Sequence, residues 1–296
     1  MNLIIGSHVS FNSKKQLLGS VEEALSYNAN TFMIYTGGAQ STARNSINDE
    51  FTYEAFKVML ENNINPKNVI VHAPYIVNLA NKSDERKYDF YIDFMANELN
   101  RVKELGLDKI VLHPGSATTC TKEEAISNIT EGINKIYEKT TDVMILLEYM
   151  SGKGNEVGTS ILELKNIIDN INDKDRIGVC LDTCHMNDSG IDISKFNEFL
   201  NEFDSMIGID KIKCVHVNDS MNTIGSHKDR HANIGYGTIG FDNLLRVVYN
   251  DRLNVPFIIE TPYINRNTNE SFAPYKYEIE SIRNKEFIDF KEKYEK

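Results

Sequence analysis

The feature that most constrains the fold is a series of eight short apolar runs along the 296-residue chain. The runs cover residues 3–9, 31–35, 69–73, 109–113, 143–148, 177–182, 212–217 and 257–260. Successive runs start between 28 residues apart (Leu3 to Thr31) and 45 residues apart (Ile212 to Phe257), which is the spacing of strand–helix units rather than of hairpins. Their Val and Ile content and weak alternation indicate strands that are buried on both faces, as in a parallel sheet.

The segments between the runs have helical periodicity and helix-start signals. Capping boxes are predicted at Ser20, Thr121 and Ser160, where a Ser or Thr precedes a Glu by three residues. The charged segment 285–296 is expected to form an amphipathic terminal helix. No Pro-, Gly- or Ser-rich linker divides the chain. Eight strand–helix units therefore predict an α/β fold, with a single closed (β/α)8 TIM barrel domain over residues 1–296.

Composition excludes several classes of protein. The chain has no run near the roughly 20 apolar residues that a membrane helix needs, and its start lacks the features of a signal peptide. Its four cysteines form no C-x-x-C pair, which disfavours a disulfide scaffold and a cysteine zinc knuckle. We therefore expect a cytoplasmic protein without a membrane partner. The formal charge of −11 argues against a broad basic nucleic-acid-binding surface, and it suits a protein that holds several cations.

Polar residues end the apolar runs or follow them closely. Active sites of βα barrels lie at the C-terminal face of the strands, so we expect these side chains to meet at one rim and form a metal cluster there. They are His72, His113, Glu148, Asp182, His185, His216, Asp229, His231 and Glu260. A single histidine in such a place is usually a packed rim or core residue. Nine convergent polar residues are difficult to explain in that way, because buried unpaired carboxylates are unfavourable and metal ions compensate them.

The residue types in this set indicate the chemistry. Imidazole and carboxylate ligands without thiolate suit Zn²⁺, and also Mn²⁺ or Fe²⁺. Nine ligands are too many for one tetrahedral ion, whereas three ions that share a bridging carboxylate would each have three or four contacts and open positions. Clustered ions generate a hydroxide nucleophile near neutral pH and neutralise charge on the attacking and leaving oxygens. The set therefore predicts hydrolysis of a phosphate ester.

Several motifs resemble those of endonuclease IV, a family of apurinic/apyrimidinic (AP) endonucleases. They are Leu181-Asp182-Thr183-Cys184-His185, His216-Val217-Asn218-Asp219-Ser220 and Lys228-Asp229-Arg230-His231-Ala232-Asn233-Ile234-Gly235-Tyr236-Gly237. The resemblance extends from Gly6 to Pro262. It implies a (β/α)8 enzyme with a trinuclear zinc site, which hydrolyses the phosphodiester 5′ to abasic sites in double-stranded DNA and leaves a 3′-hydroxyl and a 5′-deoxyribose phosphate. It also implies 3′-end phosphodiesterase activity.

The resemblance further implies a role for each ligand. His72, His113 and Glu148 would hold the first zinc. Glu148 would bridge to the second, which Asp182, His216 and Glu260 complete, and His185, Asp229 and His231 would hold the third. A hydroxide between the first two ions would attack the phosphate, and the third ion would stabilise the leaving oxygen. Glu148 and Glu260 are the candidate catalytic residues that position or deprotonate the attacking water.

Loops at the rim are expected to recognise the damaged DNA. Tyr75 and Ile76 could insert as a wedge at the unstacked step, although Tyr75 suits ordinary rim packing equally well. Gln40 stands where some members of the family have Arg, so its part in filling the vacated stack stays open. Lys228 and Arg230 either hold phosphates or form a solvated surface pair. Selectivity needs no base contact, because an abasic nucleotide has no stacking energy to lose when it flips out.

Two other functions are weighed against this interpretation. A metal-dependent sugar isomerase or epimerase of the xylose isomerase-like barrels would need only one or two ions, which leaves His185, Asp229 and His231 unexplained. A metal-stabilised DNA-binding protein without turnover would have no need of an open metal site. We expect a monomer whose partner is double-stranded DNA with abasic sites. Zn²⁺ is the expected cofactor, with Mn²⁺ or Fe²⁺ as alternatives at some positions.

Overall fold

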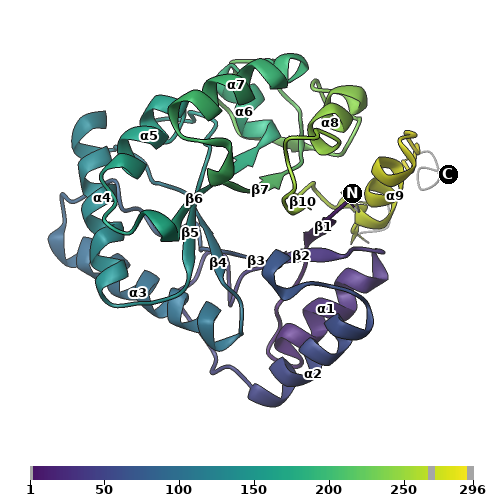
Figure 1. Cartoon of the computed structure of the whole chain (residues 1–296), viewed down its shortest axis with the longest axis horizontal. Coiled ribbons are helices and arrows are strands. Elements are labelled where there is room, and N and C mark those ends of the chain that lie inside the picture. Colours follow the sequence, from purple (N-terminus) through teal and green to yellow (C-terminus); the bar gives the residue numbers. More distant parts are fainter. Residues whose placement is uncertain (1–2, 266–270, 292–296) are drawn as a thin grey trace.

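The computed structural model describes residues 3–265 and 271–291. Eight parallel strands form a closed barrel in the order β1-β10-β7-β6-β5-β4-β3-β2 (Figure 1). They are β1 (Ile5–His8), β2 (Thr31–Ile34), β3 (Ile70–His72), β4 (Lys109–Leu112), β5 (Met144–Glu148), β6 (Ile177–Asp182), β7 (Ile212–His216) and β10 (Phe257–Ile259). Every one of these strands lies within a predicted apolar run, so the predicted (β/α)8 barrel is confirmed.

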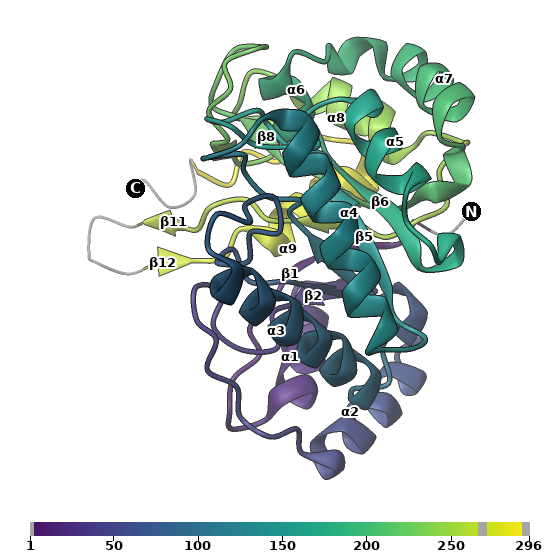
Figure 2. The ribbon, with the colours of Figure 1, turned by 90° about the vertical axis from the view of Figure 1, so that its left-hand side faces the viewer.

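Helices surround the barrel, as the two ribbon views show (Figures 1 and 2). They are α1 (Gln16–Ser26), α2 (Asp49–Glu61), α3 (Glu85–Glu104), α4 (Lys122–Glu138), α5 (Ile161–Asp169), α6 (Thr183–Ser189), α7 (Phe196–Met206), α8 (Phe241–Val248) and α9 (Tyr275–Asn284). Short 3-10 helices cover Pro66–Asn68, Lys174–Arg176, Ile193–Lys195 and Ile209–Lys211. In the described part of the chain, no helix is both long and apolar enough to cross a membrane.

Two small antiparallel ribbons lie outside the barrel. One pairs β8 (Asp219–Ser220) with β9 (His231–Ala232), and the other pairs β11 (Ile264–Asn265) with β12 (Ser271–Phe272). The β8–β9 ribbon brings the predicted ligand His231 back beside the end of β7, because Ser220 and His231 are register partners. Figure 2 shows the β11–β12 ribbon projecting from one side of the molecule.

The predicted helix starts are partly right. Thr121 and Glu124 form a complete capping box at the start of α4, and Ser160 caps α5. Ser20 does not start a helix: α1 begins earlier, at Gln16, so Ser20 lies inside it and its hydroxyl donates to a backbone carbonyl.

The predicted terminal helix is wrong over residues 285–291. Helix α9 ends at Asn284, and Lys285 adopts the left-handed conformation with φ of 55°, which stops the helix. Residues 286–291 follow without helical structure, and residues 292–296 lie outside the described part of the chain. A charged, amphipathic composition therefore did not suffice to extend the helix beyond this left-handed residue.

Inside the barrel, the strands contribute one apolar layer and, above it, one polar layer. The lower layer consists of fully buried side chains: Met33, Ile70, Val111, Leu146, Cys180, Cys214 and Ile258. Two residues further along the same strands stand Tyr35, His72, His113, Glu148, Asp182, His216 and Glu260. Alternate residues of a strand face the same side, so this spacing directs all of these side chains to the C-terminal end of the barrel interior. Six of the nine predicted ligands are among them.

Candidate metal centre

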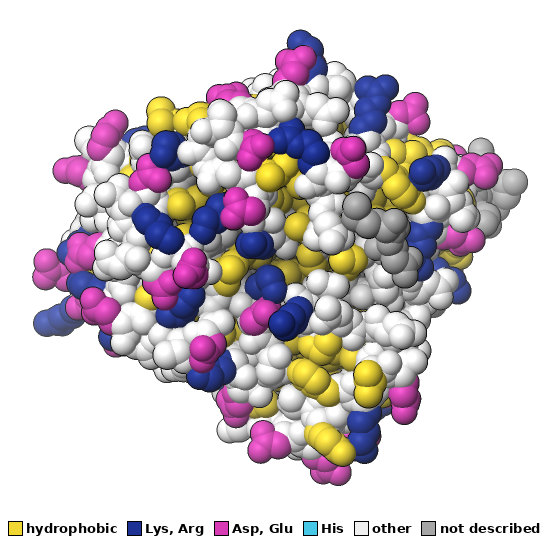
Figure 3. Space-filling model, viewed as in Figure 1, with side chains coloured by type: hydrophobic (Ala, Val, Ile, Leu, Met, Phe, Trp, Pro, Cys, Tyr) yellow, Lys and Arg dark blue, Asp and Glu magenta, His cyan; other side chains and the backbone are white. Residues whose placement is uncertain are grey.

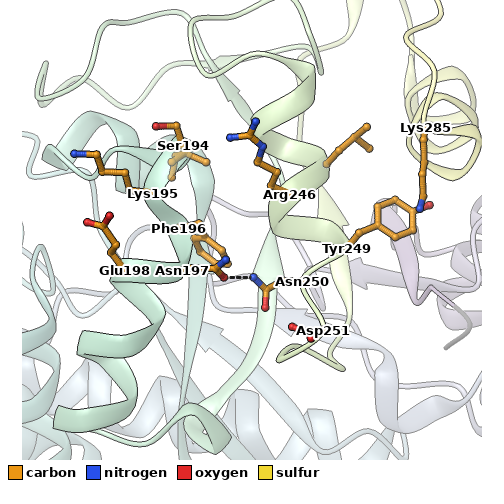
Figure 4. A pocket seen from close by; sticks show the side chains of 12 residues that line it. Ser194, Lys195, Phe196, Asn197, Glu198, Arg246, Tyr249, Asn250, Asp251 and Lys285 are labelled. Atoms are coloured by element: carbon orange, nitrogen blue, oxygen red, sulfur yellow. Dashed lines mark hydrogen bonds between the residues drawn. The ribbon is translucent and has the colours of Figure 1, made fainter.

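The nine predicted ligands are grouped at one end of the barrel. Seven of them line a pocket of about 360 Å³, together with Gln40, Tyr75, Lys153 and Glu156. The other two, Asp182 and His216, lie fully buried beneath it. A larger cleft of about 710 Å³ lies at the outer surface between α7, α8 and Lys285 (Figure 4), and none of the nine residues lines it. We therefore place the functional site in the smaller pocket, because the candidate chemistry is there.

The first group consists of His72, His113 and Glu148, whose ligand atoms all lie within 4.8 Å of one another. The Nε2 atoms of His72 and His113 lie 3.2 Å and 2.9 Å from Oε2 of Glu148. The Nδ1 atom of His72 lies 2.7 Å from the carbonyl oxygen of Ala73. A carbonyl can only accept, so Nδ1 of His72 donates to it, and Nε2 is the ring atom that faces the carboxylate.

The second group surrounds the other oxygen of Glu148. Nδ1 of His216 lies 3.1 Å from Oε1 of Glu148 and 2.9 Å from Oε2 of Glu260. Asp182 also belongs to this group, with Oδ2 at 3.9 Å from the same His216 atom. Asn218 orients two of the carboxylate residues: its amide nitrogen donates to Oδ2 of Asp182 at 2.7 Å, and its amide oxygen accepts from the backbone N–H of Glu260 at 2.9 Å.

The third group contains His185, Asp229 and His231. Oδ1 of Asp229 lies 3.1 Å from Nε2 of His185 and 3.6 Å from Nε2 of His231. Oδ2 of Asp182 is almost as near to His231, at 3.7 Å, and the ligand atoms of Asp182, His185 and His231 all lie within 4.8 Å of one another, so Asp182 faces both the second and the third group. The ring Nδ1 atoms of His185 and His231 face the carbonyl oxygens of Tyr149 and Glu260, at 3.1 Å and 3.3 Å.

The charges in this cluster shift one another's pKa values. Burial would raise the pKa of Glu148, but the charges of His113 and His216 outweigh burial and hold it well below its usual range. Glu260 follows the same pattern, with His216 as the main partner, and its pKa is also lowered. Burial would lower the pKa of His185, whereas Asp182 and other carboxylates raise it well above its usual value. Glu148 and Glu260 are therefore ionised, and positive charge on the neighbouring imidazoles favours that state.

This donor set fits divalent metal ions. His72, His185 and His231 each direct Nδ1 to a backbone carbonyl, which is the usual arrangement of a metal-binding histidine whose Nε2 faces the ion. If neither a proton nor a cation lies between each Nε2 atom and the carboxylate oxygen that it faces, two hydrogen-bond acceptors point at each other, which is unfavourable. The Nε2 atom of His231 is buried, and it has no hydrogen-bond partner among the residues that the structure describes. Cations would relieve these contacts and balance the carboxylates at the same time.

The structure places the predicted DNA-contacting residues unequally. Gln40 and Tyr75 line the pocket, and the Tyr75 side chain is half exposed and hydrogen-bonded through its hydroxyl to Tyr35. Ile76 is partly buried and packs against the core. Lys228 and Arg230 are exposed on either side of Asp229 and are not part of the pocket lining. Figure 3 shows a face of the molecule on which no histidine is visible, and basic and acidic side chains are interspersed on its described part.

Sequence reasoning missed residues that complete or support the site. Lys153 and Glu156 line the pocket from the loop after β5, where the glycines at 152, 154 and 158 were the available signal. Asp188 on α6 is fully buried and accepts hydrogen bonds from Ser220 and from the backbone N–H of Asp229 at 2.9 Å. Asp188 thereby holds the predicted ligand Asp229, which adopts a left-handed φ of 53°.

Two thiols lie beneath the cluster. Cys180 and Cys214 are register partners on β6 and β7, and their sulfurs lie within 4.8 Å of the His216 ring. Both are fully buried, and burial raises the pKa of the Cys180 thiol well above its usual value. Each cysteine stands two residues before a predicted ligand on its own strand, so the cysteine and the ligand face the same side of that strand.

Comparison with known proteins gives consistent results. The profile of the family described as xylose isomerase-like TIM barrel matches residues 21–285. The chain is 46% identical over 289 residues to the probable endonuclease 4 of Mycoplasma capricolum, which covers 97% of this chain and 98% of that protein. It is 48% identical over 296 residues to the probable endonuclease 4 of Ureaplasma parvum, with 99% and 97% of the two chains covered.

Solved structures have the same fold as this chain, and one of them is also similar to it in sequence. The crystal structure of endonuclease IV from Thermus thermophilus superposes with a TM-score of 0.78 at 28% identity, covering 95% of this chain and 97% of that one. A D-tagatose 3-epimerase-like protein superposes with a TM-score of 0.64 at 22% identity, covering 86% and 90%. The second similarity shows a shared barrel and nothing more.

Proposed function

Because the chain belongs to the endonuclease IV family of xylose isomerase-like TIM barrels, we propose that it repairs DNA by hydrolysing the phosphodiester 5′ to an abasic site. It is a hydrolytic deoxyribonuclease, an AP endonuclease that acts on ester bonds. The observation that most supports the proposed reaction is the third ligand group beside the first two. A sugar epimerase with one or two ions would have no use for it.

We propose that three divalent ions, zinc or in part Mn²⁺ or Fe²⁺, occupy the three groups. The residues that would hold them are His72, His113 and Glu148 for the first, Glu148, Asp182, His216 and Glu260 for the second, and His185, Asp229 and His231 for the third. When bound, such ions lower the pKa of water and neutralise charge on the oxygens of the scissile phosphate. The contacts of Glu148 support a bridging role, because its two oxygens face different histidines.

Glu148 and Glu260 would have different parts in catalysis. The Glu148 side chain is almost fully buried at 1% exposure, and both of its oxygens face imidazoles, so it fixes the geometry of the cluster. Glu260 is 13% exposed at the pocket, and its Oε2 faces His216. Its Oε1 can therefore accept the proton of the attacking water. The lowered pKa keeps Glu260 ionised, so that it can accept a hydrogen bond from the attacking water and orient it, although a low pKa also makes it a weak base.

The rim side chains would select the damaged nucleotide. Tyr75 stands half exposed at the pocket, and Gln40 lies on the same side of it, so both can contact the strand around the lesion. An abasic nucleotide loses little stacking when it leaves the helix, so a pocket without base-specific contacts is selective for it. We propose that Lys228 and Arg230, which are exposed beside the pocket, contact backbone phosphates.

The same groups would support a second activity on DNA ends. Removal of a 3′-blocking group breaks the same kind of phosphoester bond, and it needs no intact base in the pocket. We therefore propose 3′-end phosphodiesterase activity at this site. We further propose that residues 1–296 act as a single domain and as a monomer.

A duplex with one tetrahydrofuran abasic analogue tests the proposal. The analogue cannot undergo β-elimination, so we expect a single cut on its 5′ side, with an intact duplex of the same sequence as the uncut control.

Glu260→Gln should retain the fold and reduce incision on the order of 100-fold or more, because the proton acceptor is lost. Metal analysis of the purified protein should give close to three transition ions per chain. No cut after loading with zinc or manganese would contradict the proposed reaction, and a single ion would favour an epimerase.

A further inference from the structure

A buried carboxylate outside the metal centre holds the loop that follows β2. Glu98 on α3 is fully buried. Its Oε1 accepts a hydrogen bond from Nε of Arg44 at 2.7 Å, and its Oε2 accepts from Nη2 of Arg44 at 3.2 Å and from the Thr36 hydroxyl at 2.7 Å. Arg101, one turn further along α3, donates to the carbonyl oxygen of Thr36 at 3.1 Å. We call these four residues, Thr36, Arg44, Glu98 and Arg101, the α3 clamp.

Polar contacts of the α3 clamp hold this loop in the place of a hydrophobic anchor. Residues 37–46 form no helix or strand, and most of their side chains are exposed. The Arg44 side chain is only 9% exposed, and its Nη1 donates back to the carbonyl oxygens of Ser41 and Ala43 at 2.8 Å and 2.9 Å. A Cβ atom at Gly37 would lie 2.6 Å from the same Nη1, so the loop closes tightly around the guanidinium.

The loop held by the clamp also holds the next loop at the pocket. The carbonyl oxygen of Ala39 accepts a hydrogen bond from the backbone N–H of Tyr75 at 2.9 Å. The hydroxyls of Tyr35 and Tyr75 lie 2.6 Å apart. Gln40, next to Ala39, and Tyr75 both line the pocket. The two loops therefore form one hydrogen-bonded unit, and α3 anchors it from the side away from the pocket.

We propose that Glu98 is a positioning residue for recognition of the abasic nucleotide. The proposal rests on the proposed function, since Gln40 and Tyr75 have this role only if the pocket receives damaged DNA. A buried ion pair often stabilises a fold no better than apolar residues of the same volume, whereas its bidentate geometry fixes orientation. Glu98 therefore acts on substrate binding through the loops, and it touches neither the ligands nor the reacting phosphate.

The test compares Glu98→Gln with Asp93→Asn in the full-length, metal-loaded protein. Asp93 is on the same helix but exposed, and it pairs with Lys139 at the surface, so the same acid-to-amide change there is a matched control. For Glu98→Gln we expect the KM for the tetrahydrofuran duplex to rise by at least about tenfold, because loops displaced by a fraction of an ångström bind the substrate poorly. We expect kcat and the number of bound metal ions to change little, and Asp93→Asn to match the wild type.

Limited trypsin digestion gives an independent readout of the clamp. Trypsin cleaves after Arg44 only when the loop releases it, so the wild type should resist cleavage there and Glu98→Gln should be cut. Arg44→Lys removes the bidentate contact but keeps the charge, and it should raise KM in the same way if Glu98→Gln folds poorly. An unchanged KM in both variants overturns the proposal, whether or not cleavage after Arg44 appears. Wild-type protein that leaves the abasic duplex uncut would instead contradict the proposed function itself.

Discussion

The candidate metal centre has a strand-borne half and a loop-borne half, which are built by different means. Six predicted ligands stand two residues beyond the apolar layer of the barrel, so the register of the strands positions them. The other three come from α6 (His185), from the segment between β8 and β9 (Asp229) and from the start of the short strand β9 (His231). A strand register needs no additional polar group to hold it, whereas an irregular segment must find acceptors for its own backbone.

Buried carboxylates provide those acceptors in the loop-borne half. Asp188 accepts from the backbone N–H of Asp229, Glu278 accepts from that of Ile234, and Asp219 accepts from those of Gly235 and other residues of the same segment. All three carboxylates are fully buried. We therefore expect single substitutions at a distance to disturb the loop-borne group selectively, whereas the strand-borne groups should respond only to changes in the predicted ligands or the barrel.

The largest effect is expected from Glu148→Gln, which alters the strand-borne half directly. The amide keeps the size of the side chain but removes the charge that both oxygens present to the surrounding histidines. Incision should fall on the order of 1,000-fold, with fewer bound ions and an unchanged circular dichroism spectrum. Near-normal turnover with a full set of ions would show that Glu148 does not link the first two groups.

An intermediate effect is expected from Asp188→Asn, which should separate the two halves. The substituted side chain would hold the backbone N–H of Asp229 less well, and loss of such a supporting contact typically weakens metal binding about 10–100-fold. Metal analysis after dialysis should show loss of about one ion per chain, with the others retained. Asp251→Asn, an exposed acid-to-amide change outside the centre, should retain every ion. Equal loss from all three groups would break the distinction between the halves.

The smallest effect on activity is expected from Glu278→Gln, which concerns stability and pH. Burial raises the pKa of Glu278 to about 7, above its ordinary value of 4.5, although the donors of Thr261, Asn233 and the backbone of Ile234 oppose the shift. The folded state therefore keeps this proton more tightly than the unfolded state does. The resulting contribution to stability is fully present below pH 4.5 and is lost as the pH rises to about 7. It amounts to about 3 kcal/mol.

Chemical denaturation at several pH values measures this effect. The free energy of unfolding of the wild type, relative to Glu278→Gln, should fall between pH 4.5 and pH 7 and then become constant. A constant difference over the whole range would show that Glu278 ionises normally in the fold.

The sequence predicts the strand-borne half well because periodicity is a local property. The eight apolar runs match the eight strands, and alternation along them accounts for the common direction of six predicted ligands. For Asp229 and His231, only the resemblance to a family pointed to particular roles, since the segment around Asp229 has a left-handed backbone and no period. Helix α1 begins at Gln16, four residues before the predicted capping box, and Gln16 has a positive φ of 44° that no sequence pattern indicated.

The supporting carboxylates could not be predicted because their partners are distant in the chain. Glu98 lies 62 residues from Thr36 and 54 from Arg44, and Asp188 lies 41 residues from Asp229. Each stands in a helix whose own pattern gives no reason for a buried acid. Only the closed barrel brings these pairs together, so their function becomes visible with the tertiary structure.

The closure of the barrel also sets the time at which the enzyme can first act. Strand β1 pairs with both β2 and β10, so the barrel cannot close at β1 until β10 has been synthesised. Glu260 follows β10 directly. At synthesis rates of about 5–20 residues per second, the interval between His72 and Glu260 on the ribosome is on the order of ten seconds or more. During that interval the nascent chain lacks Glu260 and the closed barrel, so we expect a chain that ends before β10 to leave DNA uncut.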